Sequence, residues 1–163
     1  MRTRFLLIGT LALLLGACSS QKSKVPPLPH KEWLVGKWKN SAQAQFLTGY
    51  EFDKDGGLKV MFQGLKEPIA GKYTWSDDRT VVLEYAKSAE VEKTYEAAAK
   101  TFKEQVNERI QTKKLDGRAG PSLLRSAADK LPEKDTFTVG LVDPKYLILS
   151  RPDVSSMSFE KVD

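Results

Sequence analysis

Short segments in which apolar and polar residues alternate recur about every 10 to 12 residues between residues 46 and 85. Turn-forming residues, such as those of the run 53–57, separate these segments. Alternation with a period of two is typical of strands that bury one face, and evenly spaced short strands are typical of a meander or barrel. Alternation returns at about residue 135 and continues to about residue 162. The pattern predicts about eight short strands in an antiparallel β-barrel or a strongly curved sheet.

A block with helical spacing interrupts the strands at about residues 88–131, between the fifth and sixth segments. A long helix is predicted from about Ala89 to Leu115, with Ser88 as its N-cap and Gly117 at the C′ position. A second, shorter helix is predicted to begin at Pro121. The fold class is therefore mainly β with a helical insertion (α+β). An α+β sheet with the long helix across its concave face is the alternative.

The long helix has an apolar stripe, because residues spaced by three or four lie on one helix face. We expect this stripe to pack against the barrel, with docking of a partner protein or contact with a membrane as alternatives. The apolar face comprises Val91, Tyr95, Ala98, Phe102, Val106 and Ile110. Later in the chain, the segment 146–150 is nearly all apolar, which predicts a strand covered on both faces.

The N-terminal residues have the order of a secretory signal: a cationic start, an apolar run over residues 5–15, and small residues before Cys18. The apolar run is too short to span a bilayer, which needs about 20 residues. The sequence Leu-Gly-Ala-Cys at 15–18 resembles the lipobox of bacterial lipoproteins. This resemblance implies that Cys18 is acylated, for example with palmitate, and that residues 1–17 are a signal peptide that is removed. An ordinary signal peptide with an incidental cysteine, or an uncleaved N-terminal helix, are the alternatives.

A lipoprotein of this kind would sit on the membrane through its lipid anchor and would not cross it. Ser19 resembles the sorting signal for the outer membrane, which predicts a lipid-anchored protein of the cell envelope that faces the periplasm. Residues 18–31 are polar and rich in proline, and they are interpreted as a flexible spacer. Residues 32–163 are interpreted as the folded domain.

Few catalytic arrangements are compatible with this composition. His30 is the only histidine and lies in the spacer, and Cys18 is the only cysteine. These counts argue against a Ser-His-Asp triad, a Cys-His pair and a zinc site in the domain. No glycine-rich phosphate loop is present, and the lysines are scattered among glutamates, unlike the basic stripe of a nucleic-acid-binding protein. We expect no metal, no cofactor, no nucleic acid and no enzymatic activity, although two carboxylates could still meet in a cleft.

Gly36-Lys37-Trp38 on the first predicted strand, together with the meandering strands and the final segment 158–162, resembles small bacterial lipocalin-like domains. The resemblance implies that Gly36 permits close packing, that Trp38 closes the barrel floor, and that Lys161 lies across the Trp38 ring. It implies a lipocalin-like fold, although the helical insertion departs from the family pattern. An aromatic pocket lining is a further expectation, for which the candidates are Tyr50, Phe62, Tyr73 and Trp75. The alternative is that these aromatic side chains form the core.

Two functions follow from these expectations. The first is a non-enzymatic envelope lipoprotein that binds an apolar small molecule or lipid in its barrel. The second is a structural or interaction lipoprotein with a filled barrel, whose helical insertion docks an envelope protein.

Overall fold

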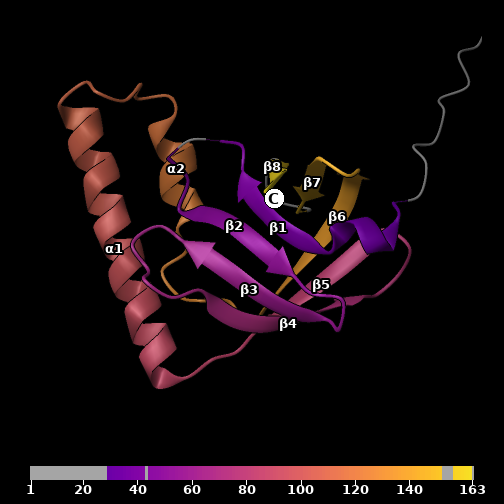
Figure 1. The fold of residues 1–163 in the computed structure, drawn as a ribbon. Helices are drawn as coiled ribbons and strands as arrows, with labels where there is room; N and C mark the ends of the chain where they lie inside the picture. The colour runs from indigo at the N-terminus through magenta and orange to yellow at the C-terminus, as the bar shows by residue number, and fades with distance from the viewer. Residues whose placement is uncertain (1–28, 43, 152–155, 163) are drawn as a thin grey trace, which may run out of the picture.

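A computed structural model describes residues 29–42, 44–151 and 156–162 (Figure 1). Eight strands form a closed barrel in which neighbours along the chain pair antiparallel and β8 pairs with β1. The strands are β1 (Gly36–Asn40), β2 (Leu47–Phe52), β3 (Gly57–Phe62), β4 (Ile69–Trp75), β5 (Thr80–Tyr85), β6 (Lys134–Val142), β7 (Tyr146–Ser150) and β8 (Met157–Val162). This closed up-and-down barrel confirms the predicted lipocalin-like fold class and excludes the open sheet.

Three helices complete the described part of the chain. The 3-10 helix η1 (Lys31–Leu34) precedes β1, and α1 (Ala89–Gln111) and α2 (Gly120–Ser126) lie between β5 and β6, as predicted. In Figure 1, η1 stands at one end of the barrel and α1 at the other. None of the helices in the described parts of the chain has the length and apolar character that a membrane span requires.

The barrel encloses a single apolar core, because each strand sends alternate side chains inward. On β5, for example, Val81, Leu83 and Tyr85 are buried while Glu84 is exposed. All the described core residues lie between Leu34 and Phe159. A chain that begins at residue 19 therefore keeps every described contact of the barrel.

The long helix begins where the sequence predicts and ends earlier. The Ser88 hydroxyl caps it by accepting the N–H of Val91 at 3.2 Å. The helix ends at Gln111, four residues before Leu115, because Lys113 adopts a positive φ of 55° and takes the reversing role expected of Gly117. Lysine tolerates that conformation less well than glycine, so residue type alone did not indicate it.

Strand β7 differs from its prediction. Leu147 and Leu149 are fully buried, but Tyr146 is 50% exposed and Ile148 is half-buried. The strand therefore has one face inside the barrel and one outside, and the expectation that both faces are covered is wrong. The run is nearly all apolar because the outward-facing residues of this strand are apolar as well as the inward-facing ones.

Candidate functional site

The end of the barrel next to η1 is closed by Trp38. Its side chain is fully buried, and its indole N–H donates to the Leu34 carbonyl at 2.7 Å. Lys161 lies opposite Trp38 in the β1–β8 register and places its ammonium 5.1 Å from the centre of the Trp38 ring. The same ammonium donates to the Val35 carbonyl at 2.8 Å and to the Trp33 carbonyl at 3.4 Å. Lys161 thus joins a cation–π contact to two hydrogen bonds.

Gly36 makes this arrangement possible. It has a φ of +133°, and a Cβ at this position would lie 2.5 Å from Cε of Lys161. A side chain here would be strained by the backbone conformation and would displace the lysine. The structure therefore brings together the three residues Gly36, Trp38 and Lys161 that the sequence suggested for a floor.

The four aromatic residues suggested as a pocket lining are distributed over the barrel. Tyr50 lies inside, 1% exposed, and contacts the rings of Phe52, Phe137 and Phe159. Tyr73 and Trp75 lie towards the η1 end, where the Tyr73 hydroxyl donates to the Asp53 carbonyl and Lys31 lies 5.4 Å from the Trp75 ring centre. Phe62 lies at the opposite end and packs edge-on against Tyr95 of α1. The four side chains therefore do not line one common cavity.

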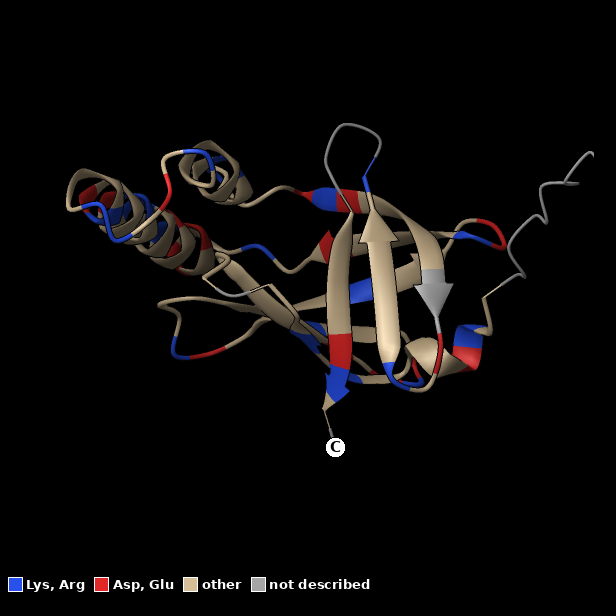
Figure 2. Ribbon diagram, turned by 90° about the horizontal axis from the view of Figure 1, so that it is seen from above, with Lys and Arg blue, Asp and Glu red and all other residues tan. Residues whose placement is uncertain are grey.

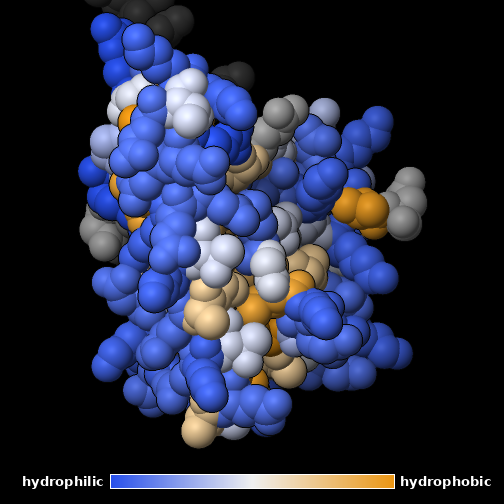
Figure 3. Space-filling view, turned by 90° about the vertical axis from the view of Figure 1, so that its left-hand side faces the viewer, coloured by the Kyte–Doolittle hydropathy of each residue, from blue (hydrophilic) through white to orange (hydrophobic). Residues whose placement is uncertain are grey.

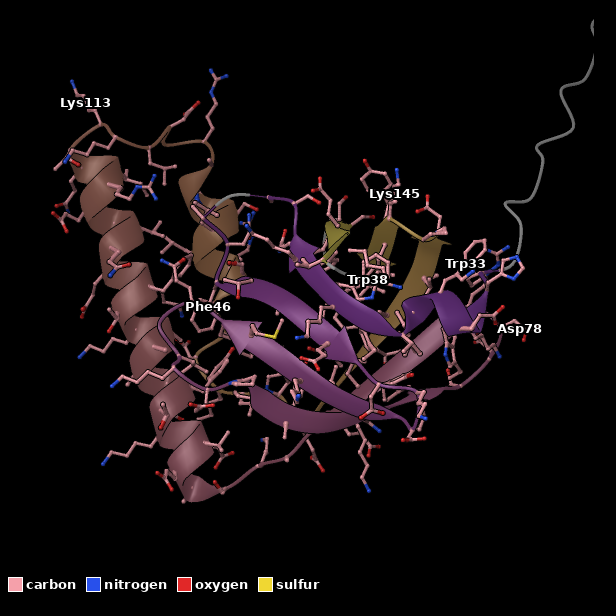
Figure 4. The ribbon with its side chains drawn as sticks, in the orientation of Figure 1. Trp33, Trp38, Phe46, Asp78, Lys113 and Lys145 are labelled. Carbon is pink, nitrogen blue, oxygen red and sulfur yellow. The ribbon has the colours of Figure 1, made fainter. Side chains whose placement is uncertain are left out.

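The interior of the described barrel is occupied by side chains. The largest fully buried ones come from the strands, from η1 and from the residue just before β2, and they include Trp38, Tyr50, Phe46, Phe52, Phe137, Phe159 and Leu34. At the helix end, α1 closes the mouth through Tyr95 and Phe102, whose rings lie 5.4 and 5.3 Å from that of Phe46 (Figure 4). Both ends of the barrel are thus covered, one by Trp38 and the other by α1.

A polar cluster lies beneath α1 at the same mouth and includes residues that the sequence did not single out. The Asp135 carboxylate accepts a hydrogen bond from the Tyr85 hydroxyl at 2.7 Å and from the Arg151 guanidinium at 2.6 Å. Arg151 also stacks 4.9 Å from the ring centre of Phe137, and its buried Nε has no hydrogen-bond partner among the described residues. We name Tyr50, Tyr85, Asp135 and Arg151 the mouth cluster.

The electrostatics of the mouth cluster keep its tyrosines neutral. Burial raises the pKa of Tyr50 and of Tyr85 above the usual value, and the nearby Asp135 carboxylate adds to both shifts. Burial and the same carboxylate raise the pKa of Tyr95, in α1 above the cluster, to about 12. A tyrosine is already protonated at neutral pH, and the raised pKa values keep these hydroxyls protonated at alkaline pH as well.

A groove lies between α1 and the loop that joins β3 to β4. Its volume is about 450 Å³, and Figure 3 shows an apolar patch among hydrophilic side chains on this face of the molecule. Small and polar residues form most of the lining, with Phe102 as its aromatic member. The lining residues are Gln63, Gly64, Thr94, Ala97, Ala98, Thr101, Phe102 and Gln105.

Two further expectations concern a metal site and the lipidation site. The described residues contain no group of three or more histidine, cysteine, aspartate or glutamate side chains arranged to hold a metal. Cys18, the expected lipidation site, lies outside the described residues, as do the signal peptide and most of the spacer.

No protein-family model matches the chain, and no curated protein matches it. Among solved structures, it is similar to a lipocalin-like protein from Bacteroides uniformis ATCC 8492, with 16% identity and a TM-score of 0.43 over 79% of this chain and 97% of that one. It is also similar to an uncharacterized protein from Bacteroides eggerthii DSM 20697, with 19% identity and a TM-score of 0.40 over 78% of this chain and 98% of that one. With TM-scores below 0.5, neither likeness assigns a function.

Proposed function

We propose that the protein is a non-enzymatic lipoprotein of the cell envelope, anchored through Cys18, whose filled barrel is a rigid support for the helical insertion. The insertion then contacts an envelope partner. The observation that carries this proposal is the filled interior: aromatic side chains occupy the described barrel, and Trp38 and α1 cover its two ends. A typical small-molecule site needs about 300 to 1,000 Å³ of concave space, which such an interior does not offer.

Ligand content tests the filled barrel. The protein is purified from its native membrane, extracted with organic solvent, and analysed by mass spectrometry for bound lipid. We expect no stoichiometric lipid beyond the acyl chains on the protein itself. A soluble form beginning at residue 19 should also fail to enhance the fluorescence of anilinonaphthalene sulfonate. One apolar molecule per barrel would instead favour a carrier function.

The anchor is tested separately with Cys18→Ser. The expected result is loss of labelling by a palmitate analogue and release of the protein from the membrane fraction, or a block in its processing. Ser19→Ala and Ser20→Ala are controls that keep the cysteine. Equal labelling of Cys18→Ser and the unmodified protein would exclude acylation at this residue.

A second candidate is suggested by the groove beside α1, whose volume of about 450 Å³ lies in the range of small-molecule sites. An apolar molecule could bind there, outside the barrel. Ala97 is exposed and lines the groove, so Ala97→Trp should fill it and abolish such binding. Lys100→Trp, an exposed position on the same helix that does not line the groove, is the matched control.

A further inference from the structure

The outer face of β7 and β8 carries a strip of apolar side chains. Because Leu147, Leu149 and Phe159 point into the barrel, the residues between them point outward. Tyr146 is 50% exposed and Val162 is 45% exposed, and these are the large apolar residues that stand out on the described surface. Ile148 lies half-buried beside Tyr146 on the same outer face of β7.

Lysines surround this strip. Lys37 lies opposite Val162 and Lys39 lies opposite Glu160 in the β1–β8 register, and both lysines are exposed. Lys145 precedes Tyr146 in the β6–β7 turn, and its carbonyl accepts the N–H of Lys161. Two acidic residues lie within this arrangement: Glu160, opposite Tyr146 in the β7–β8 register, and Asp143, which accepts the N–H groups of Lys145 and Tyr146. The strip therefore combines an interfacial aromatic residue with a local excess of positive charge.

A second group of cations lies at the connection between α1 and α2. All five are exposed, and no salt bridge within the described parts of the chain joins any of them to a carboxylate. Asp116, the acid between them, accepts the backbone N–H of Arg118 at 2.9 Å. The five cations are Arg109, Lys113, Lys114, Arg118 and Arg125.

Both groups belong to one side of the molecule. Figure 2 looks onto this side, with β7, β8 and the blue segments of the α1–α2 connection towards the viewer. In Figure 4, Lys113 and Lys145 both stand at the upper edge of the molecule. The described chain begins at residue 29, beside η1 at the upper right of Figure 1. We name the strip, its lysines and the five cations of the α1–α2 connection the basic face.

We propose that the basic face rests on the anionic phospholipid surface of the membrane that holds the lipid anchor. The inference rests on the proposed anchoring at Cys18 for the choice of membrane. Tyrosine is favoured at the membrane–water boundary, and each lysine or arginine near an anionic surface strengthens binding about fivefold. The charges and the exposed tyrosine thus suit the same partner.

The reach of the spacer agrees with this arrangement. Eleven residues, 18–28, separate the expected acylated end from the start of the described chain. An extended chain of this length spans at most about 40 Å, so the barrel stays close to the lipid surface that the acyl chains enter. A single lipid-linked end leaves rotation of the domain free, and the basic face would fix which side meets the membrane.

Vesicle binding tests the proposal with a soluble form that begins at residue 19 and carries no acyl chain. It is sedimented with vesicles of phosphatidylcholine alone or of an equal mixture of phosphatidylcholine and phosphatidylglycerol. We expect binding to the mixed vesicles only, weakened by added salt because screening shortens the range of the attraction. Lys113→Gln, Lys114→Gln and Arg118→Gln together should weaken binding on the order of a hundredfold, from about fivefold per charge.

Two further variants separate local from net charge. Lys37→Gln, Lys39→Gln and Lys145→Gln together should weaken binding to a similar extent. The triple change Lys54→Gln, Lys66→Gln and Lys72→Gln removes the same charge from exposed positions on other parts of the barrel and should leave most of the binding intact. Tyr146→Ser should weaken binding and Tyr146→Phe should restore it.

Three outcomes would overturn the proposal: no binding of the unmodified soluble form to mixed vesicles at low ionic strength, equal weakening by all three triple variants, or a stable dimer that buries Tyr146 and Val162. Because the soluble form used in this test carries no lipid, its vesicle binding does not depend on whether Cys18 is acylated in the full protein. Failure of the basic face and failure of the anchor are therefore distinguishable.

Discussion

The side chain of Lys161 links the first strand, the last strand and the segment around η1 at one end of the barrel. Its ammonium contacts the Trp38 ring and the carbonyls of Trp33 and Val35. A lysine usually keeps its ammonium in water. Here carbonyl oxygens and an aromatic face take the place of water around the ammonium. The fit depends on the small residue beside it, Gly36, and on the size of Trp38.

Gly36→Ala should destabilise the domain by more than about 1 kcal/mol, because a Cβ strains the positive φ and meets Lys161. Gly117→Ala is the matched control, since a Cβ at that position meets no atom within 4 Å. The free energy of unfolding from urea titration compares the two variants. Similar stabilities would show that Gly36 is not required for the packing.

Trp38→Ala should cost about 3–5 kcal/mol of stability, the usual range for truncating a buried aromatic residue. The change also leaves the Leu34 carbonyl without its indole donor. Trp33 is only partly buried, so Trp33→Ala should cost distinctly less. Thermal unfolding of both variants tests this order, and equal shifts in melting temperature would contradict it.

The mouth cluster shows what a residue-by-residue interpretation of the sequence missed. Asp135 served only to mark where the strand pattern returns, and Arg151 was not singled out. Each lies two residues from a buried residue, Phe137 and Leu149 respectively, and therefore on the same, inward-facing side of the chain. This spacing was the available signal in the sequence. The partnership itself depends on how β6 and β7 meet in space, which alternation within one segment does not specify.

At the scale of elements, α1 covers the barrel mouth and is not a separate appendage. Its buried side chains Tyr95, Phe102 and Val106 follow the predicted stripe, and Tyr95 contacts Phe46 and Phe62 at the barrel mouth. The spacing of apolar residues was sufficient to predict this face, because burial of a helix requires one continuous stripe.

Phe102→Asp should destabilise the domain by several kcal/mol, because it places a carboxylate against Phe46 without a partner. Asn107→Asp introduces the same side chain at an exposed position of α1 and should have little effect. Urea unfolding of the soluble form beginning at residue 19 measures both. If the Phe102 variant unfolds at the same urea concentration as the unmodified chain, the stripe does not pack as described.

The strands were predictable to a similar degree, with instructive exceptions. Alternation located β2 to β5 and the order of the later strands, because strands with one buried face have a strict period of two. The end of α1 was not predictable, since Lys113 and not a glycine reverses the chain. The apolar run in β7 was ambiguous, because an outward Tyr146 looks in the sequence like a buried one.

For the whole molecule, the buried tyrosines connect the mouth of the barrel to its stability at alkaline pH. Tyr50, Tyr85 and Tyr95 come from three different elements and have raised pKa values in the folded protein, mainly because of burial. In the unfolded chain they lose their protons near the usual value of about 10. The folded state therefore binds more protons than the unfolded state above that pH.

The contribution of these tyrosines to the free energy of unfolding should be fully present below about pH 10 and should fall as the pH rises further. Each tyrosine contributes a slope of about 1.4 kcal/mol per pH unit until its folded-state pKa is reached. Urea titrations between about pH 9 and pH 12 measure the slope, and Tyr95→Phe should reduce it by the contribution of one tyrosine. A stability that does not change over this range would contradict the burial of these hydroxyls.

The pairing of β1 with β8 has a consequence for the order of synthesis. The barrel closes only when the last strand reaches the first, across almost the whole length of the domain. Contacts between such distant segments form slowly, so a nascent chain stays open until its final residues are available. Until then β1 and β7 both present unpaired edges, which other chains can join. A premature stop codon shortly before Met157 would leave that state permanent, with aggregation in place of a folded domain.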